Sequence, residues 1–165
     1  MNFVKGLNDC SDFACIFDLV KQAAEITMNK RRVGLILGLS ELPMFIGAYH
    51  GVGSNFIVMN KKLLNEVIRR ARDKRLVNSY IFHVLLHEYI HSLGFIDEKE
   101  TQYMTYVVSA KVLGENHPAT QMAKYGINSV FSGVGTLNHF ESKRDISEII
   151  EIIEDFEREN MSYFG

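Results

Sequence analysis

Residues 84–94 have the sequence VLLHEYIHSLG, a His-Glu-x-x-His pattern inside a strongly apolar segment. On a helix, residues four apart lie one turn above each other, so His87 and His91 point the same way. Two imidazoles at this spacing can hold a tetrahedral Zn²⁺ ion, and Glu88 beside them can accept a proton from a metal-activated water. Burying these polar groups among Leu, Ile and Val is costly unless they are paired or bind something. We therefore predict a zinc site with His87 and His91 as ligands and Glu88 as general base.

A catalytic zinc site needs a third protein ligand, and the residues that follow the helix offer two arrangements. In the first, Gly94 lets the chain reverse and Asp97, six residues after His91, turns back to the metal. In the second, the ligand is a glutamate of the next helix, Glu100 or Glu98. Asp97 and Glu100 also have the spacing of a capping box, and a carboxylate that caps a helix is not free to bind a metal. We expect Asp97 or Glu100 equally, ahead of Glu98.

Length and composition are those of one compact domain. The chain has 165 residues, of which 47% are apolar and 23% charged, and its formal net charge is −2. This charge gives no general attraction to nucleic acid or to an anionic membrane, so we expect neither as a partner. The basic run 69–75 is a local exception, which we interpret as the solvated face of a helix.

The two cysteines and the N-terminus bear on the compartment. Cys10 and Cys15 are separated by four residues, and in a chain of this length we expect reduced, partly buried thiols. Residues 1–10 lack the apolar core of a signal peptide. No apolar run approaches the roughly 20 residues of a membrane span. We therefore expect a cytoplasmic protein.

Hydrophobic periodicity and turn residues predict an α+β fold in one domain, 1–165, with 115–165 as a helical C-terminal extension. A small twisted sheet, including a hairpin of 45–50 and 56–60, should pack on the active-site helix. Residues 126–142 should form a loop or lid. The other expected elements are a strand at 33–39 and helices at 12–29, 61–76, 79–93, 98–113 and 118–125. A last helix should begin after an Asp145 cap, with its apolar face formed by Ile146, Ile149, Ile150, Ile153 and Phe156.

A resemblance supports this interpretation. Residues 86–100, LHEYIHSLGFIDEKE, are similar to the active-site segment of small zincin metallopeptidases, above all the small archaeal minigluzincins. The hairpin resembles the sheet that precedes the active-site helix in such domains, and the resemblance extends over about 33–113. It implies a sheet, an active-site helix and a following helix that bears a Glu ligand. It also implies His87 and His91 as metal ligands and Glu88 as general base and acid.

Zinc-dependent hydrolysis of peptide bonds is accordingly the expected function, with a peptide or protein as substrate. Two alternatives stay open: a metal-dependent endoribonuclease, and a latent or inactive zinc-stabilised scaffold. Endoribonucleases with a similar histidine pair carry Gly where this chain has Glu88, so Glu88 favours a peptidase. The residues that could donate a hydrogen bond to a developing oxyanion are His50, His117, His139, Tyr103 and Tyr106.

Overall fold

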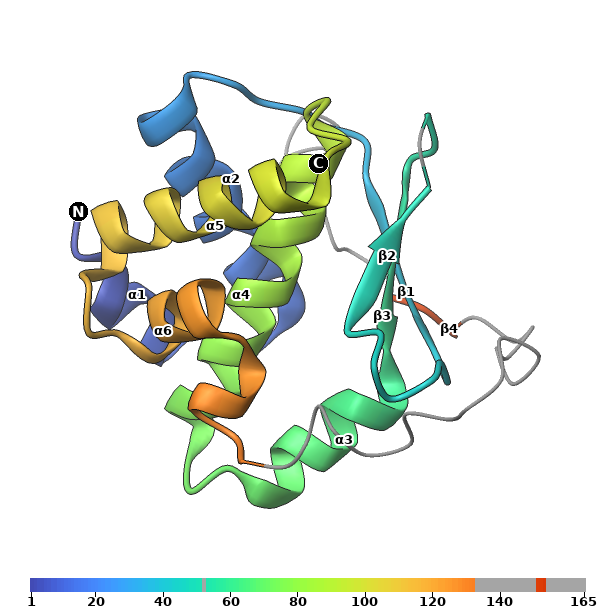
Figure 1. Ribbon diagram of the computed structural model, residues 1–165, viewed down its shortest axis with the longest axis vertical. Coiled ribbons are helices and arrows are strands. Elements are labelled where there is room, and N and C mark those ends of the chain that lie inside the picture. Colours follow the sequence, from blue (N-terminus) through green and yellow to red (C-terminus); the bar gives the residue numbers. More distant parts are fainter. Residues whose placement is uncertain (52, 133–150, 154–165) are drawn as a thin grey trace, which may run out of the picture.

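The computed structural model describes residues 1–51, 53–132 and 151–153 (Figure 1). A mixed sheet stands on one side and a group of helices on the other, with helix α4 (Lys74–Ser92) between them (Figure 1). The α+β class predicted from the sequence is thereby confirmed. Within the described ranges, no helix combines the length and the apolar character needed to cross a membrane.

Helix α4 forms the centre of the core because it is apolar around most of its circumference. Its side chains Phe82, Leu85, Leu86, Tyr89 and Ile90 are fully buried. The helix begins at an N-cap, Asp73, whose carboxylate accepts the backbone N–H of Leu76. The helices packed against α4 are α1 (Phe3–Asp9), α2 (Phe13–Met28), α3 (Lys61–Arg70), α5 (Glu98–Leu113) and α6 (Pro118–Tyr125).

The sheet has the strand order β2-β3-β1-β4. Strand β1 (Ile36–Ser40) runs parallel to β3 (Phe56–Asn60), with Leu37 opposite Ile57. Strand β2 (Ala48–His50) is antiparallel to β3, so the predicted hairpin is confirmed. Among the described strands, β2 is the last on its side of the sheet, and it lies next to α4 (Figure 1).

The loop before β2 is held by one buried side chain, Asn60. Its Nδ2 donates to the backbone oxygens of Leu42, Pro43 and Ile46, at 2.8–3.1 Å. Its Oδ1 accepts the N–H of Leu42 at 3.1 Å and caps the first turn of α3. A single amide therefore fixes the approach of the chain to β2, the strand nearest to α4.

Two helix boundaries differ from the predicted ones. We predicted one helix over 61–76 and a second from 79, but α3 ends at Arg70 and α4 begins at Lys74. Asp73 caps α4, and Asn78, just before the predicted start, lies inside the helix with its amide donating to the backbone oxygens of Leu7 and Cys10. Helix α1, which was not predicted, has seven residues and is too short for a clear periodic pattern.

The C-terminal part of the chain agrees with prediction only in part. Helix α6 begins and ends as predicted, and a short 3₁₀ helix, η1 (Ile127–Ser129), follows it in the segment predicted to be a loop. A last helix was predicted after Asp145, but Glu151 and Ile152 form strand β4, antiparallel to β1. The prediction of helix is therefore wrong at these two residues. The remaining residues of that predicted helix lie outside the described part.

The prediction of reduced thiols is also wrong. Cys10 and Cys15 form a disulfide with a Cα–Cα distance of 5.5 Å, and it joins the end of α1 to the first turn of α2. The two helices approach each other here because Asp12 caps α2 immediately after the turn. Sequence spacing alone could not reveal this, since four intervening residues fit a disulfide only if the turn brings both side chains together.

Candidate metal centre

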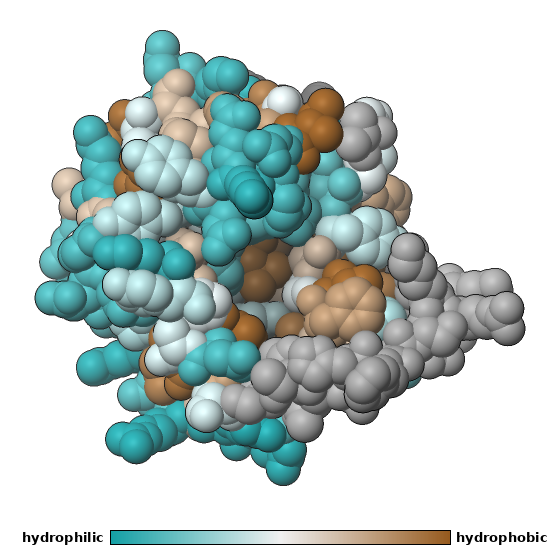
Figure 2. Space-filling model, in the orientation of Figure 1, coloured by the Kyte–Doolittle hydropathy of each residue, from teal (hydrophilic) through white to brown (hydrophobic). Residues whose placement is uncertain are grey.

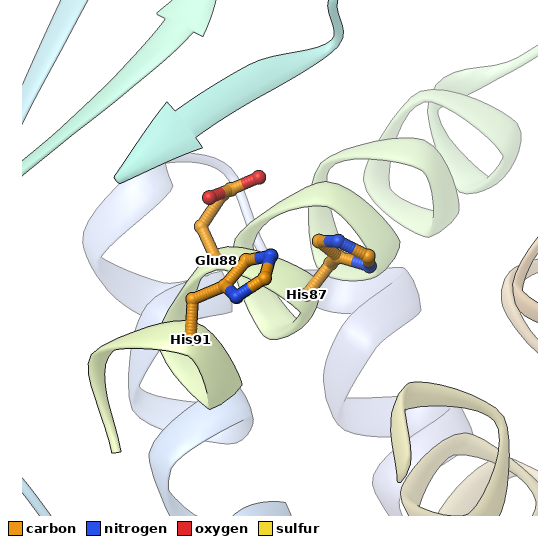
Figure 3. A group of neighbouring side chains, drawn as sticks. All are labelled: His87, Glu88 and His91. Atoms are coloured by element: carbon orange, nitrogen blue, oxygen red, sulfur yellow. The ribbon is translucent and has the colours of Figure 1, made fainter. Parts of the chain in front are cut away.

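Three potential ligand side chains lie together on α4. His87, Glu88 and His91 each offer one ligand atom, and these atoms all lie within 4.8 Å of one another. The imidazole centroids of His87 and His91 are 4.9 Å apart, as expected for residues one helical turn apart. Figure 3 shows the two imidazoles side by side and the Glu88 carboxylate directed toward the sheet. This group is close enough to bind a metal ion.

A fourth side chain, Glu98, reaches the two histidines from α5. One carboxylate oxygen lies 2.6 Å from Nε2 of His87 and the other 3.0 Å from Nε2 of His91. Gly94, at φ 112°, ends α4 and turns the chain so that α5 begins beside the histidines. Glu98 therefore bridges the two imidazoles that the sequence predicted to be ligands.

The two residues expected as third ligands lie differently. Asp97 is the N-cap of α5, and its carboxylate accepts the backbone N–H of Lys99 at 3.3 Å. Glu100 follows Glu98 by two residues, which places the two side chains about 200° apart around the helix. With Glu98 facing the histidines of α4, Glu100 faces away from them and is exposed. The structure thus brings Glu98, which the sequence analysis placed third, to the histidines.

Contacts on the far side of His91 define which nitrogen carries its proton. Its Nδ1 lies 2.6 Å from the backbone oxygen of Phe95, and a carbonyl oxygen can only accept, so Nδ1 is protonated. The hydroxyl of Thr101, a buried residue of α5, lies 3.3 Å from the same nitrogen and 3.0 Å from the Phe95 oxygen. In the neutral imidazole, Nε2 then presents its lone pair to the Glu98 carboxylate.

This geometry fits a bound cation. An unprotonated Nε2 and a carboxylate oxygen 3.0 Å apart are two acceptors that repel each other. A positive ion bound between them would remove this repulsion. Burial lowers the pKa of His87, although the nearby Glu98 partly opposes this, so the neutral, metal-binding form of His87 is favoured. Two imidazoles and one carboxylate are also a ligand set that Zn²⁺ accepts.

Glu88 differs from Glu98 in its surroundings. Its side chain is almost fully buried, and burial raises the pKa of Glu88 to about 7. That net value also includes a smaller raising effect of the Glu98 charge and the lowering effects of His91 and of a hydrogen bond from the backbone of His50 on β2. A carboxylate poised near neutral pH can both accept and return a proton, which is what a general base and acid must do.

The site lies in a cleft between α4 and the sheet. A recess of about 520 Å³ extends on the His91 side and one of about 330 Å³ on the His87 side. Ala48, Glu88 and Glu98 line both recesses, so the two meet at the site. Figure 2 shows the hollow between the helices and the sheet, with an apolar floor. The cleft is open to solvent on the side of Glu98, whose side chain is 69% exposed.

Among the candidate oxyanion donors, only His50 lines a recess that borders the site. Its Nε2 lies 2.9 Å from the backbone oxygen of Ser54. His117 is the N-cap of α6, with its Nδ1 accepting from the backbone, and Tyr106 donates to Glu115. Tyr103 is exposed on α5, and His139 lies outside the described residues.

The basic run 69–75 forms the end of α3 and the start of α4. Arg69 and Arg70 both pair with Glu66, one turn earlier on α3. Arg70 also donates to the backbone oxygen of Ser132 at 2.8 Å. Part of this positive charge is therefore compensated within the chain.

Comparisons with known proteins identify no relative. No protein-family model matches the chain, and no curated protein or solved structure is significantly similar to it.

Proposed function

We propose that this protein is a zinc-dependent peptidase in which His87, His91 and Glu98 hold the metal ion and Glu88 is the general base. The resemblance of residues 86–100 to small zincin metallopeptidases is part of this proposal. The observation that carries it is the position of Glu98, which reaches Nε2 of both histidines from the helix that follows α4. A third ligand from that next helix is what the resemblance implies.

The metal supplies Lewis acidity when bound, for activating water and for polarising a peptide carbonyl. Glu88 lies beside the histidines and is buried, so its carboxylate can take a proton from the attacking water and deliver it to the leaving amine nitrogen. The Nδ1–H of His91 donates to the Phe95 oxygen, which orients the imidazole and keeps Nε2 directed at the site. This division of roles explains why one glutamate is buried and the other is exposed.

The cleft suits an extended peptide. Among the described strands, β2 forms the edge of the sheet on the α4 side, and a peptide can add to such an edge as a further strand. Ala48 of β2 lines both recesses, so a peptide bound there would pass directly over the site. Its side chains would alternate between the recesses and solvent.

Hydrolysis of an unstructured protein, such as reduced casein, tests the proposal. The zinc-loaded full chain should cleave it, a chelator should abolish cleavage, and added zinc should restore it. Glu88→Gln should keep the zinc and lose at least about 10²-fold in rate, since it removes the proton acceptor but no metal ligand. Glu100→Gln, an equivalent change on the exposed face of α5, is the matched control and should leave the rate unchanged.

Two results would contradict this proposal. Full activity in Glu88→Gln would exclude the assigned base. Stoichiometric zinc without cleavage of any unstructured substrate would favour a zinc-stabilised scaffold instead.

A further inference from the structure

A charged side chain that the proposed mechanism does not use, Arg32, lines the larger recess beside the site. Arg32 belongs to the segment between α2 and β1, so it is distant in sequence from the metal-binding helix. Arg32 is half-buried and lines the same recess as Glu88 and His91. A cation beside a metal centre, at one end of a cleft, is a candidate for recognising part of the substrate.

The backbone of Arg32 is fixed by α4 itself. The Arg32 N–H donates to the hydroxyl of Tyr89 at 2.7 Å, and this hydroxyl lies 3.3 Å from the Arg32 carbonyl oxygen. Tyr89 is fully buried and follows Glu88 directly in the sequence. The backbone of Arg32 is therefore anchored to the helix that carries the proposed general base.

The guanidinium is held by neutral groups only. Nη1 donates to the backbone oxygen of Ser92 at 2.8 Å, and Nη2 donates to the Ser54 oxygen and to Oδ1 of Asn55, at 3.0 and 2.9 Å. These contacts tie the end of α4 to the β2–β3 turn. Among the described residues, no carboxylate lies within ion-pair distance of Arg32.

The charge of Arg32 is therefore uncompensated by any carboxylate in the described ranges. A guanidinium has five N–H donors, and the three hydrogen bonds above leave two without a protein acceptor there. Ordering a long cation before a ligand arrives lowers the entropic cost of binding that ligand. An anionic group that enters the recess would meet a preorganised, unneutralised cation.

We propose that Arg32 binds a carboxylate group of the substrate at the His91 end of the cleft. This inference rests on the proposed peptidase function, and it names a class of substrate: a peptide with a carboxylate on that side of the scissile bond. The carboxylate is either an Asp or Glu side chain or the C-terminal carboxylate of the peptide. Arg32 is thus a residue that determines specificity and takes no part in proton transfer.

A structural role for Arg32 makes a different prediction. Its contact with Ser92 places a cation at the C-terminus of α4, which stabilises the helix dipole. If this were its whole function, replacing Arg32 would weaken the binding of every peptide alike. A role in recognition instead changes the ratio between acidic and neutral peptides of otherwise identical sequence.

The test measures peptide binding to the zinc-loaded full chain carrying Glu88→Gln, which prevents cleavage. The probes are fluorescent unstructured peptides of one sequence, in pairs with Glu or Gln at each position in turn and with a C-terminal carboxylate or carboxamide. We expect the carboxylate form of one pair to bind roughly 10-fold more tightly, as for a charge-assisted hydrogen bond. Which pair shows the preference distinguishes a side chain from the C-terminus.

Arg32→Gln in the same protein should abolish this preference, whereas Arg31→Gln should keep it. Arg31 is the matched control because it is the neighbouring arginine, pairs with Glu25 and does not line the recess. If Arg32→Gln fails to fold, the affinity ratio of each peptide pair is measured in the protein that retains Arg32, at NaCl concentrations from about 50 to about 500 mM. Screening by salt should reduce the preference for the carboxylate form.

Several outcomes would overturn the inference about Arg32: equal affinity within every pair, no binding of any peptide, or a preference that persists in Arg32→Gln or does not respond to salt. Cleavage of casein without any such preference would remove this inference and leave the peptidase. A preference for carboxylates without cleavage would support the role of Arg32 and contradict the peptidase function.

Discussion

Replacing Glu98 by Ala removes the proposed third metal ligand. The carboxylate lies 2.6 and 3.0 Å from the two imidazole nitrogens, so Glu98→Ala leaves His87 and His91 as the only protein ligands of the proposed set. Structural zinc sites with four ligands bind with about 10–16 kcal/mol, or about 3 kcal/mol for each ligand. Glu98→Ala should therefore weaken zinc binding on the order of 10²-fold.

Competition with a chromophoric chelator measures this change, with Glu100→Ala as the matched control on the same helix. Glu100 faces away from the histidines, so Glu100→Ala should bind zinc as the wild type does. Asp97→Ala should lose about 1 kcal/mol of stability, because Asp97 caps α5, but should also keep its zinc affinity. Wild-type affinity in Glu98→Ala together with weak binding in either of the other variants would refute this assignment of the ligand.

Three further changes test the surroundings of the site. Thr101→Val removes the hydroxyl beside Nδ1 of His91 and should weaken zinc binding about 10-fold in the same competition assay, and no change would contradict an orienting role. Burial lowers the pKa of His83 to about 3, whereas in the unfolded chain this imidazole has its ordinary pKa of about 6.5. As the pH falls below about 6.5, the unfolded chain therefore binds a proton at His83 and the folded protein does not. Between about pH 7.5 and about pH 5, the metal-free wild type should therefore lose up to about 2 kcal/mol more free energy of unfolding than His83→Gln, as measured by urea unfolding. Equal losses in the two proteins would contradict a buried, neutral His83. Replacing Cys10 and Cys15 by Ala opens a short loop and should lower the free energy of unfolding by about 2 kcal/mol, whereas an effect near zero would contradict a disulfide in the native protein.

Local sequence signals predicted several helix boundaries well. Helix α2 begins after the Asp12 cap and ends at Met28, and its C-cap, Asn29, adopts the left-handed conformation typical of a helix end. Helix α5 begins after Asp97 and α6 after His117, both as predicted. These positions depend on hydrogen bonds between neighbouring residues, which the sequence displays directly.

The proposed third ligand could not be chosen from spacing, because the choice depends on how α5 is rotated about its axis. Asp97, Glu98 and Glu100 are all within reach in sequence, and only the direction in which α5 leaves Gly94 selects the one that faces α4. One signal was present: a capping residue is already engaged, which removes Asp97 from the candidates. Glu98 and Glu100 point to nearly opposite sides of α5, and the sequence does not state which side meets α4.

Arg32 and the disulfide were missed for a related reason. Arg32 contacts residues of the β2–β3 turn and of the end of α4, up to 60 positions away in the chain. In the sequence it belongs to a short basic run with no periodic pattern. Likewise, the Cys10–Cys15 contact depends on a turn between two helices, of which α1 was not predicted. Tertiary packing created both features.

The most direct test of the central claim is a crystal structure of the zinc-loaded full chain, with anomalous scattering measured at the zinc edge. We predict one anomalous peak, about 2.0–2.2 Å from Nε2 of His87, from Nε2 of His91 and from a carboxylate oxygen of Glu98. Glu88 should lie beside the metal without binding it. The absence of a peak at the two histidines, or a peak bound by Asp97 or Glu100 in place of Glu98, would contradict the metal centre described above.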